Sequence, residues 1–205
     1  MKSYSLILNF PHAAVDAINR AGQKVVLVKS VTGGGGRTAW VTFAPFQQNV
    51  VIWSGQYGIY ASTSQIETGA MITQCSIVDP AQTGVEYPFQ HNTFQSAAVP
   101  DTWTVSPTQY ATGNENGGAL TFGLRQAASV NGTRVITGPV NAVSVLPGQH
   151  AIFQPHERIC VFVESNVDNG AVVSTVSSNS TTIDLTTTTS QTATYNAATG
   201  TFVVG

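Results

Sequence analysis

Short stretches of alternating apolar and polar residues recur along the chain and predict β-strands. In residues 37–44 two sets of side chains alternate, which is the period-two pattern of a half-buried strand. One set is Thr38, Trp40 and Thr42, and the other is Ala39, Val41 and Phe43. Four consecutive aliphatic residues at 25–28 predict a strand that is buried on both faces. The same reasoning predicts strands at 3–10, 24–31, 37–44, 49–54, 57–62, 70–78, 119–125, 134–138, 140–146, 152–154, 159–164, 171–177, 181–187, 191–195 and 201–204, and residues 102–105 are a possible short strand.

The apolar spacing is helical only at residues 11–21, where it predicts one short helix. Ala14, Ala17 and Ile18 recur at helical spacing, Pro11 suits the first turn, and Gly22 suits the position after the last turn. The predicted strands are short, and turn signals separate them about every eight to twelve residues, as in sandwiches and barrels. The sequence therefore predicts an all-β fold with antiparallel β-sandwich architecture and one short N-terminal helix.

Two segments that lie 101 residues apart resemble each other and suggest an internal repeat. Aligned without a gap, residues 57–76 and 158–177 share a serine, a glycine, an alanine and a second serine, and both carry an acidic turn residue, Glu67 or Asp168. Each segment is interpreted as a strand, a polar turn and a second strand, that is, a hairpin. A true duplication predicts two related β modules.

The segment with the weakest pattern divides these modules. It contains Pro100, Pro107 and a cluster of asparagine and glycine at 114–118, which are turn and loop signals. The predicted boundaries are a first module at 1–94 that includes the helix, a connector at 95–117 and a second module at 118–205. The modules could form one pseudo-symmetric sandwich or two separate domains.

Charged residues are scarce in this chain, and their scarcity bears on which functions are expected. Charged residues make up 9% of the sequence, the formal net charge is −2, and no basic run is present, so a nucleic-acid footprint is absent. A nearly neutral surface has little long-range repulsion, and uncharged polar groups are easier to desolvate than ions. The composition favours contact with protein or sugar surfaces, although a sandwich with incidentally low charge fits it equally well.

The apolar runs, the first residues and the cysteines indicate where in or outside the cell the protein is expected. No apolar run reaches the length needed to span a bilayer, and the first residues lack the cleavage signature of a secretory signal. Cys75 and Cys160 both lie in predicted strands and are expected to be buried free thiols in a reducing compartment. We therefore expect a cytoplasmic protein, or one released without a classical signal peptide.

Motifs for catalysis, cofactors and metals are weak. The glycine run at 33–36 is followed by a predicted strand, which fits a hairpin turn better than a phosphate-binding loop. His150 and His156 are separated by Pro155 and lack a third ligand nearby, so no metal site is predicted. The serines, histidines and carboxylates show no catalytic spacing. We expect no cofactor and no enzymatic activity, while a hydrolase with two carboxylates stays open as an alternative.

Aromatic residues gather in the first half of the chain and give one candidate binding site. If Trp53 and Tyr57 flank the Gly55 turn at a loop tip, they could form, with Tyr60, a stacking platform for a sugar or a membrane interface. The alternative is that these residues belong to the core. The size and expected lack of a leader are similar to those of small fungal and bacterial sandwich lectins and cytolysins. No motif supports that likeness, so no fold, site or activity is inferred from it.

The threonine-rich tail gives a second candidate site, for self-association. Thr186, Thr187, Thr188 and Thr189 lie in a row within the tail at 181–194, where a long uncharged edge strand would lack the lysines that blunt an exposed edge. The first hypothesis is therefore a non-enzymatic surface-recognition protein that associates with copies of itself into a homo-oligomer or larger assembly. The second is a lectin-like or membrane-binding defence protein.

Overall fold

The computed structural model describes residues 2–132, 134–174 and 176–205, and it is almost entirely β. Its elements, in chain order, are β1 (Ser3–Asn9), α1 (His12–Arg20), β2 (Gln23–Thr32), β3 (Gly36–Thr38), β4 (Val41–Phe43), β5 (Gln48–Ser54), β6 (Gly58–Ser62), β7 (Gln74–Val78), β8 (Glu86–Gln90), β9 (Thr93–Phe94), β10 (Tyr110–Asn114), β11 (Leu120–Val130), β12 (Arg134–Pro139), β13 (Asn141–Val145), β14 (His150–Ser165), β15 (Val172–Val173), β16 (Thr181–Asp184), β17 (Ser190–Asn196) and β18 (Thr201–Val204).

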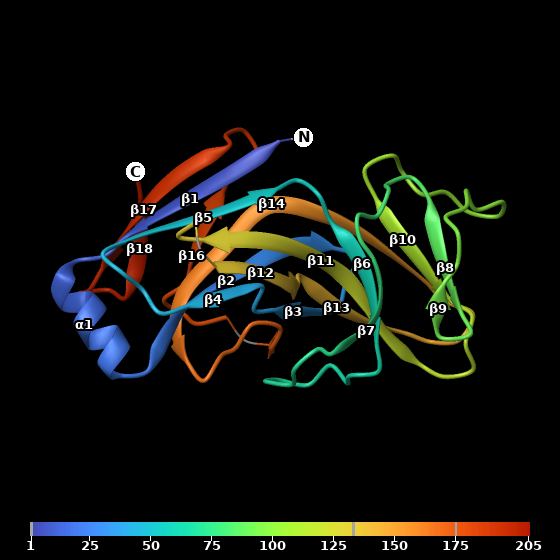
Figure 1. Ribbon diagram of the computed structural model, residues 1–205, viewed down its shortest axis with the longest axis horizontal. Helices are drawn as coiled ribbons and strands as arrows, with labels where there is room; N and C mark the ends of the chain where they lie inside the picture. Colours follow the sequence, from blue (N-terminus) through green and yellow to red (C-terminus); the bar gives the residue numbers. More distant parts are fainter. Residues whose placement is uncertain (1, 133, 175) are drawn as a thin grey trace.

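Two curled sheets pack face to face as a sandwich (Figure 1). The larger is 11-stranded, with the main path β15–β3–β13–β11–β5–β1–β17–β18, and β12, β6 and β7 join it through β11. The smaller is 7-stranded, with the path β4–β2–β14–β10–β8–β9, and β16 pairs with β14. The predicted all-β sandwich with one short N-terminal helix is confirmed. The pairing is not wholly antiparallel, because β1–β17 and β8–β10 are parallel.

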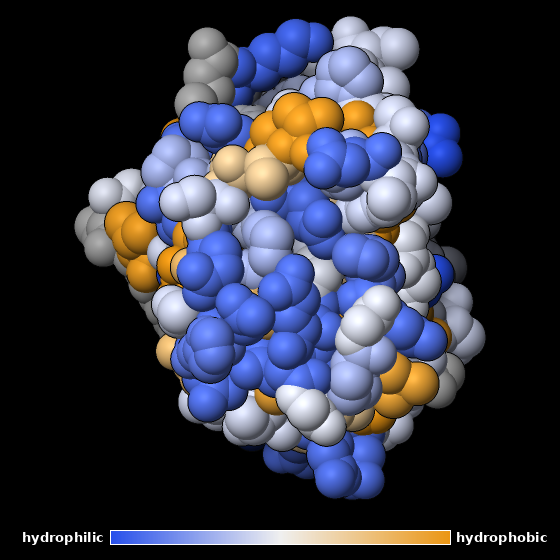
Figure 2. All heavy atoms as spheres, turned by 90° about the vertical axis from the view of Figure 1, so that its right-hand side faces the viewer, coloured by the Kyte–Doolittle hydropathy of each residue, from blue (hydrophilic) through white to orange (hydrophobic). Residues whose placement is uncertain are grey.

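The core fills the space between the sheets. Alternate residues of β1, including Leu6 and Leu8, are fully buried, as is the run from Val25 to Leu27 that the sequence marked as buried on both faces. Each large apolar side chain buried this way contributes about 1.5–3 kcal/mol relative to leaving it in water. The helix lies at one end of the sandwich, and β8, β9 and β10 lie at the other (Figure 1). That second end is mainly hydrophilic, with small separate apolar patches (Figure 2).

The two predicted hairpins occupy different places. β6 pairs with β7, as expected for 57–76, but β15 pairs with β3, while β14 pairs with β2, β10 and β16. The predicted hairpin at 158–177 is therefore wrong. Strands from before residue 95 and after residue 117 also alternate within both sheets. A division into two related modules is not confirmed.

The two turns of the proposed repeat nevertheless share one local form. Ala70 donates its backbone N–H to Glu67 at 2.9 Å, and Ala171 donates to Asp168 at 3.1 Å. The glycine before each alanine has a positive φ, 78° in one turn and 85° in the other, which favours glycine. The turns also meet, through an isolated bridge between Met71 and Ala171. The sequence likeness thus reflects two similar turns that contact each other.

The segment expected to connect the modules contributes to the smaller sheet. β10 lies between β8 and β14, and all five of its residues are buried. The possible strand at 102–105 is not formed. Cys75 is exposed and Cys160 is half-buried, so the predicted burial of both thiols is wrong for Cys75.

Candidate functional site

A charged cluster, which we call the central cluster, lies between the two sheets and consists of Lys29, Glu157 and the side chains that contact them. Lys29 projects from β2 into the core, and its side chain is 0% exposed. Its ammonium donates to the Tyr57 hydroxyl at 2.8 Å, to Gln126 Oε1 at 2.9 Å and to Glu157 Oε2 at 2.9 Å. All three donor positions of the ammonium are therefore occupied.

Aromatic rings surround the same ammonium. Lys29 Nζ lies 4.9 Å from the centroid of the Trp40 ring, 5.2 Å from that of Trp53 and 5.1 Å from that of Tyr57. Cations within about 6 Å of a ring centroid are stabilised by the ring quadrupole. Trp40 and Trp53 also pack edge to face, with their ring centroids 5.5 Å apart, which holds these two rings in place around the ammonium.

The carboxylate of Glu157 completes this central cluster. β14 changes register between His156 and Ile159, an irregularity of the kind that re-aims side chains, and Glu157 lies within it. Besides Lys29, Glu157 accepts from Trp53 Nε1 at 3.0 Å and from the Tyr57 hydroxyl at 3.1 Å. Its side chain is 15% exposed, so the carboxylate joins the buried cluster to the surface.

Burial dominates the titration of the cluster. It lowers the pKa of Lys29 to about 8, against the opposing attraction of Glu157. Burial, followed by the negative charge of Glu157, raises the pKa of Tyr57 well above its ordinary value. The lysine is thus closer to losing its proton than a surface lysine, while the phenol keeps its proton.

A shallow surface depression opens over Glu157. It has a volume of about 420 Å³. We call it the tyrosine depression, because three tyrosines line it together with other residues: Lys2, Tyr4, Gly55, Tyr57, Thr83, Pro107, Thr108, Tyr110, Pro155 and Glu157. Aromatic rings beside a fixed carboxylate can stack on an apolar ring face and accept hydrogen bonds from hydroxyls.

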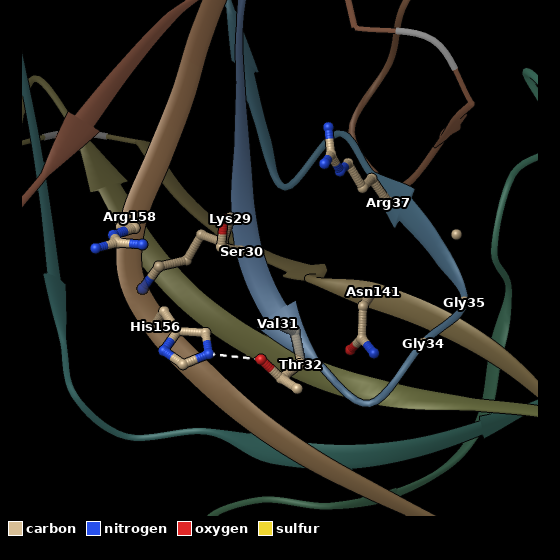
Figure 3. A pocket seen from close by; sticks show the side chains of 11 residues that line it. Lys29, Ser30, Val31, Thr32, Gly34, Gly35, Arg37, Asn141, His156 and Arg158 are labelled. Carbon is tan, nitrogen blue, oxygen red and sulfur yellow. Dashed lines mark hydrogen bonds between the residues drawn. The ribbon is translucent and has the colours of Figure 1, made fainter.

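A second hollow, of about 410 Å³, is lined by basic side chains but lacks an acid–base pair (Figure 3). Figure 3 shows Arg37 on the opposite side of β2 from His156 and Arg158. Arg158 pairs with Asp184 at 2.7 Å, and His156 Nε2 shares a 2.7 Å hydrogen bond with Thr32. These groups are engaged locally and do not converge on a common point.

The glycine run beside this hollow has a packing role. Gly33 and Gly35 have φ of +130° and +88°, and an added Cβ would lie 2.0 Å from the Ile152 carbonyl oxygen or 2.1 Å from that of Ala142. β3 follows the run, where a phosphate-binding loop would need a helix. Close approach to the neighbouring strands is therefore sufficient to explain these glycines.

The three predicted aromatic site residues do not form an exposed platform. Trp53 and Tyr57 are each 2% exposed, and Tyr60 is fully buried. Trp53 and Tyr57 come together in the central cluster, whereas Tyr60 lies apart and donates to the Asn141 backbone carbonyl at 2.6 Å. Only Tyr57 reaches a surface depression.

The four predicted edge threonines do not form a strand. Thr186 to Thr189 lie in an irregular segment between β16 and β17. Asp184 accepts from the Thr186 N–H at 2.8 Å, and Thr188 donates to the Ser190 carbonyl at 3.0 Å. Such local side-chain bonds compete with strand pairing, so the predicted edge strand does not extend through this segment.

One of the scattered histidines, His150, contacts a carboxylate and an aromatic ring at the end of the sandwich that carries β8 and β10. His150 Nδ1 lies 2.5 Å from Glu86 Oε1, and the Trp103 ring packs on the imidazole at 4.8 Å. Within residues 2–132, 134–174 and 176–205, no group of three or more His, Cys, Asp or Glu side chains could hold a metal ion.

The outer surface of the larger sheet carries an uncharged patch. It spans the neighbouring strands β12, β11, β5, β1, β17 and β18. Strand register gives one row across it, because Ile52 pairs with Ser5 and Ser129, Ser129 with Val135, and Ser5 with Ser190. The outward side chains, which we call the neutral face, are Ser3, Ser5, Ile7, Asn9, Gln48, Val50, Ile52, Ser54, Ala127, Ser129, Val135, Thr137, Ser190, Thr192, Thr194, Asn196, Thr201 and Val203.

None of these neutral-face side chains is charged, and all are at least partly exposed. Val135 is 73% exposed, Val203 59% and Ile52 42%. The next outward side chain along β11, Arg125, lies beyond the face and pairs with Asp79 at 3.5 Å. The face is thus a mixture of hydroxyls, amides and aliphatic groups on a rigid sheet.

Sequence reasoning missed the most concentrated chemistry in the molecule. Lys29 and Glu157 are 128 residues apart, and neither belongs to a motif. The available signal was Lys29, which follows four aliphatic residues in the predicted strand at 24–31, since lysine is almost never fully buried unless it is paired.

Comparison with known proteins adds no relative. No protein-family model and no curated protein matches this chain. In the parts of the chain that the structure describes, no helix is both long enough and apolar enough to cross a membrane.

Proposed function

We propose that this protein is a non-enzymatic surface-recognition protein that associates with copies of itself through the neutral face. The observation that carries the proposal is the absence of charge among the described side chains of that face. Two copies that pack through this face about a two-fold axis would experience no repulsion between like charges. Removing water from a hydroxyl-rich surface also costs less free energy than removing it from an ionic surface.

The size of the face also supports this role. Neighbouring strands lie about 4.8 Å apart, so six strands span on the order of 25 Å, and seven residues extend about 23 Å along them. A standard interface buries about 800 Å² per partner, which is the same order of size. The aliphatic side chains Ile52, Val135 and Val203 would supply its apolar contacts.

Packing of faces is favoured over addition of a strand at the C-terminal edge. The Phe202 N–H donates to Thr181 Oγ1 at 2.9 Å, and Thr181 Oγ1 donates to the Phe202 carbonyl at 3.1 Å. The outward backbone groups of Phe202 on β18 are therefore already occupied.

A matched pair of variants tests the proposal by light scattering over a concentration series. Ile52→Lys places a charge in the neutral face and should leave a monomer at concentrations where the wild type associates. Ile77→Lys places the same charge on β7, outside the face, at nearly equal exposure (44% against 42%), and should associate as the wild type does. Association that survives Ile52→Lys, or that Ile77→Lys removes equally, contradicts the assigned face.

A second candidate function, sugar recognition, is favoured by the tyrosine depression. Its fixed carboxylate and its rim threonines suit hydrogen bonds with the hydroxyls of a sugar more than contact with a membrane, since the large aromatic side chains there are not exposed. A glycan array tests it with Thr108→Arg, which should block the rim, and with Thr93→Arg on β9 as the control. If no glycan on the array binds, or if binding survives Thr108→Arg, sugar recognition at the tyrosine depression is contradicted.

A further inference from the structure

The Lys29 amine is sealed from solvent, so its chemistry is restricted to the groups that touch it. Its side chain is 0% exposed. Two of its three hydrogen-bond partners carry an acyl carbon, namely Gln126 and Glu157. The carboxylate of Glu157 resists nucleophilic attack because it is negatively charged, whereas the Gln126 side chain is a neutral amide. The amide is therefore the electrophile within reach.

The distance between these two groups is short. Lys29 Nζ lies 2.9 Å from Gln126 Oε1, and the amide carbon lies one C=O bond, about 1.2 Å, beyond that oxygen. Gln126 Nε2 donates to the Ser54 carbonyl at 2.7 Å, and turning the face of the amide toward the amine requires a rotation that breaks this bond; the terminal torsion of a glutamine itself has a broad energy minimum. Groups held this close react with effective molarities that reach about 10⁵–10⁸ M.

The neighbouring groups suit the proton movements of acyl transfer. Glu157 Oε2, 2.9 Å from the amine, can accept its proton. The Tyr57 hydroxyl accepts from the amine at 2.8 Å and donates to Glu157 Oε1 at 3.1 Å, so it holds the carboxylate beside the amine. Burial also lowers the pKa of Lys29 to about 8, so part of the amine is unprotonated near neutral pH.

We propose that Lys29 and Gln126 become joined by an intramolecular amide (isopeptide) bond, with Glu157 as the proton carrier. A bond forms between Lys29 Nζ and Gln126 Cδ, and the bond between Cδ and Nε2 breaks. The departing nitrogen leaves as ammonia, with a proton taken from the lysine amine. No oxidant, reductant or further reactant is needed.

The bond would tie the two layers of the sandwich together. Lys29 lies on β2 of the smaller sheet and Gln126 on β11 of the larger, 97 residues later in sequence. A covalent link across such a separation restricts the unfolded chain, as a disulfide does. The two cysteines of this chain are free. The reaction would also remove the cost of burying an ammonium ion.

Mass spectrometry of the intact wild-type protein tests this directly. We expect a mass that is lower than the sequence mass by one ammonia. After tryptic digestion, residues 25–37 should appear uncleaved at Lys29 and joined to residues 126–134. An unchanged intact mass overturns the proposal. Loss of one water assigns the bond to Glu157 and contradicts it, as does loss of ammonia without the branched peptide, which indicates a succinimide at an Asn-Gly step.

Two variants test the role of the carboxylate. Glu157→Leu, which removes the carboxylate without adding a second amide beside Lys29, should keep the full sequence mass, while Glu164→Leu, further along β14, should lose ammonia as the wild type does. Ammonia loss that persists in Glu157→Leu overturns the proton-carrier role. In wild-type protein refolded from freshly synthesised chain, the rate of ammonia loss should rise between pH 6 and 8 and level off above, because the neutral amine becomes abundant near its pKa of about 8. A rate independent of pH contradicts attack by Lys29.

Discussion

The interior between the sheets contains a lysine and a glutamate at 2.9 Å, whereas the outer surface of the larger sheet presents a broad face with no charged side chain. Strand β5 belongs to both regions: Trp53 points inward to Glu157, and its neighbour Ile52 points outward to the neutral face. In most proteins charge is kept at the surface, where water solvates it. Here a buried pair is held by a complete set of partners, while none of the described side chains of the neutral face is charged.

The comparison shows that low net charge does not by itself describe this surface. Exposed ion pairs exist elsewhere, as between Lys24 and Asp168 and between Arg158 and Asp184. The neutral face is therefore a local property of six neighbouring strands. An interface that forms only where charge is missing would have a defined position and register, in contrast to nonspecific precipitation of a weakly charged protein.

Removal of the buried carboxylate should have the largest effect. Glu157→Ala would leave the ammonium of Lys29 enclosed without its counter-ion, and it should lower the free energy of unfolding by roughly 3–5 kcal/mol. Glu164→Ala on the same strand should change it by less than about 0.5 kcal/mol. Denaturant titrations measure the free energy of unfolding of both variants. Equal decreases would show that the central cluster does not stabilise the fold more than an ordinary surface residue does.

Opposite charges placed on the neutral face should separate repulsion from simple disruption. Ile52→Lys and Ile52→Asp should each weaken self-association at least about tenfold, while a mixture of the two should associate more tightly than either alone. Sedimentation of the single variants and of the mixture gives the result. If the mixture behaves as the average of its components, the substituted residue is not near the contact.

Alkaline titration should distinguish the buried phenols from exposed ones. Burial raises the pKa of Tyr57 and Tyr60 above 10.0, so above that pH the unfolded state has released protons that the folded state retains. The free energy of unfolding should therefore fall as pH rises above 10. Phenolate absorbance should show these groups ionising together with unfolding, and ionisation within the intact fold would contradict their burial.

The exposed Arg158–Asp184 pair should have the smallest effect. Hydrogen bonds from Thr186, followed by Arg158, lower the pKa of Asp184 to about 2. Its contribution is therefore present above 3.8 and is lost as pH falls toward 2. Because Asp184 is solvated, Asp184→Asn should lower the free energy of unfolding far less than the loss of Glu157 does. Added salt should make the effect of Asp184→Asn smaller still, because salt screens an exposed ion pair. A loss comparable to that of Glu157→Ala would remove the contrast between buried and exposed pairs.

Local pattern was sufficient for several elements and insufficient for how they pair. The alternation in residues 3–10 and the apolar run at 25–28 record burial directly, so β1 and β2 could be predicted. β10 could not, because its small and polar residues are buried by neighbours from distant parts of the sequence. The turns at Glu67 and Asp168 have the predicted form, yet a turn does not determine which strands it joins.

The candidate site was predictable only in part, for the same reason. An aromatic cluster around Trp53 and Tyr57 was visible in the sequence, but its direction depends on the face of β5 that packs against the other sheet. Lys29 and Glu157 meet through tertiary packing alone. The neutral face likewise becomes visible only when registers place residues of six strands side by side. The threonine run at 186–189 was misleading, because β-propensity there is outweighed by local hydrogen bonds.

Solution mass over a wide concentration range tests the proposed role of the neutral face most directly. The wild-type protein should rise above the monomer mass of 21.5 kDa as its concentration increases, and Ile52→Lys should stay at that mass throughout. A wild-type protein that remains at the monomer mass at the highest concentration reached would contradict self-association through this face.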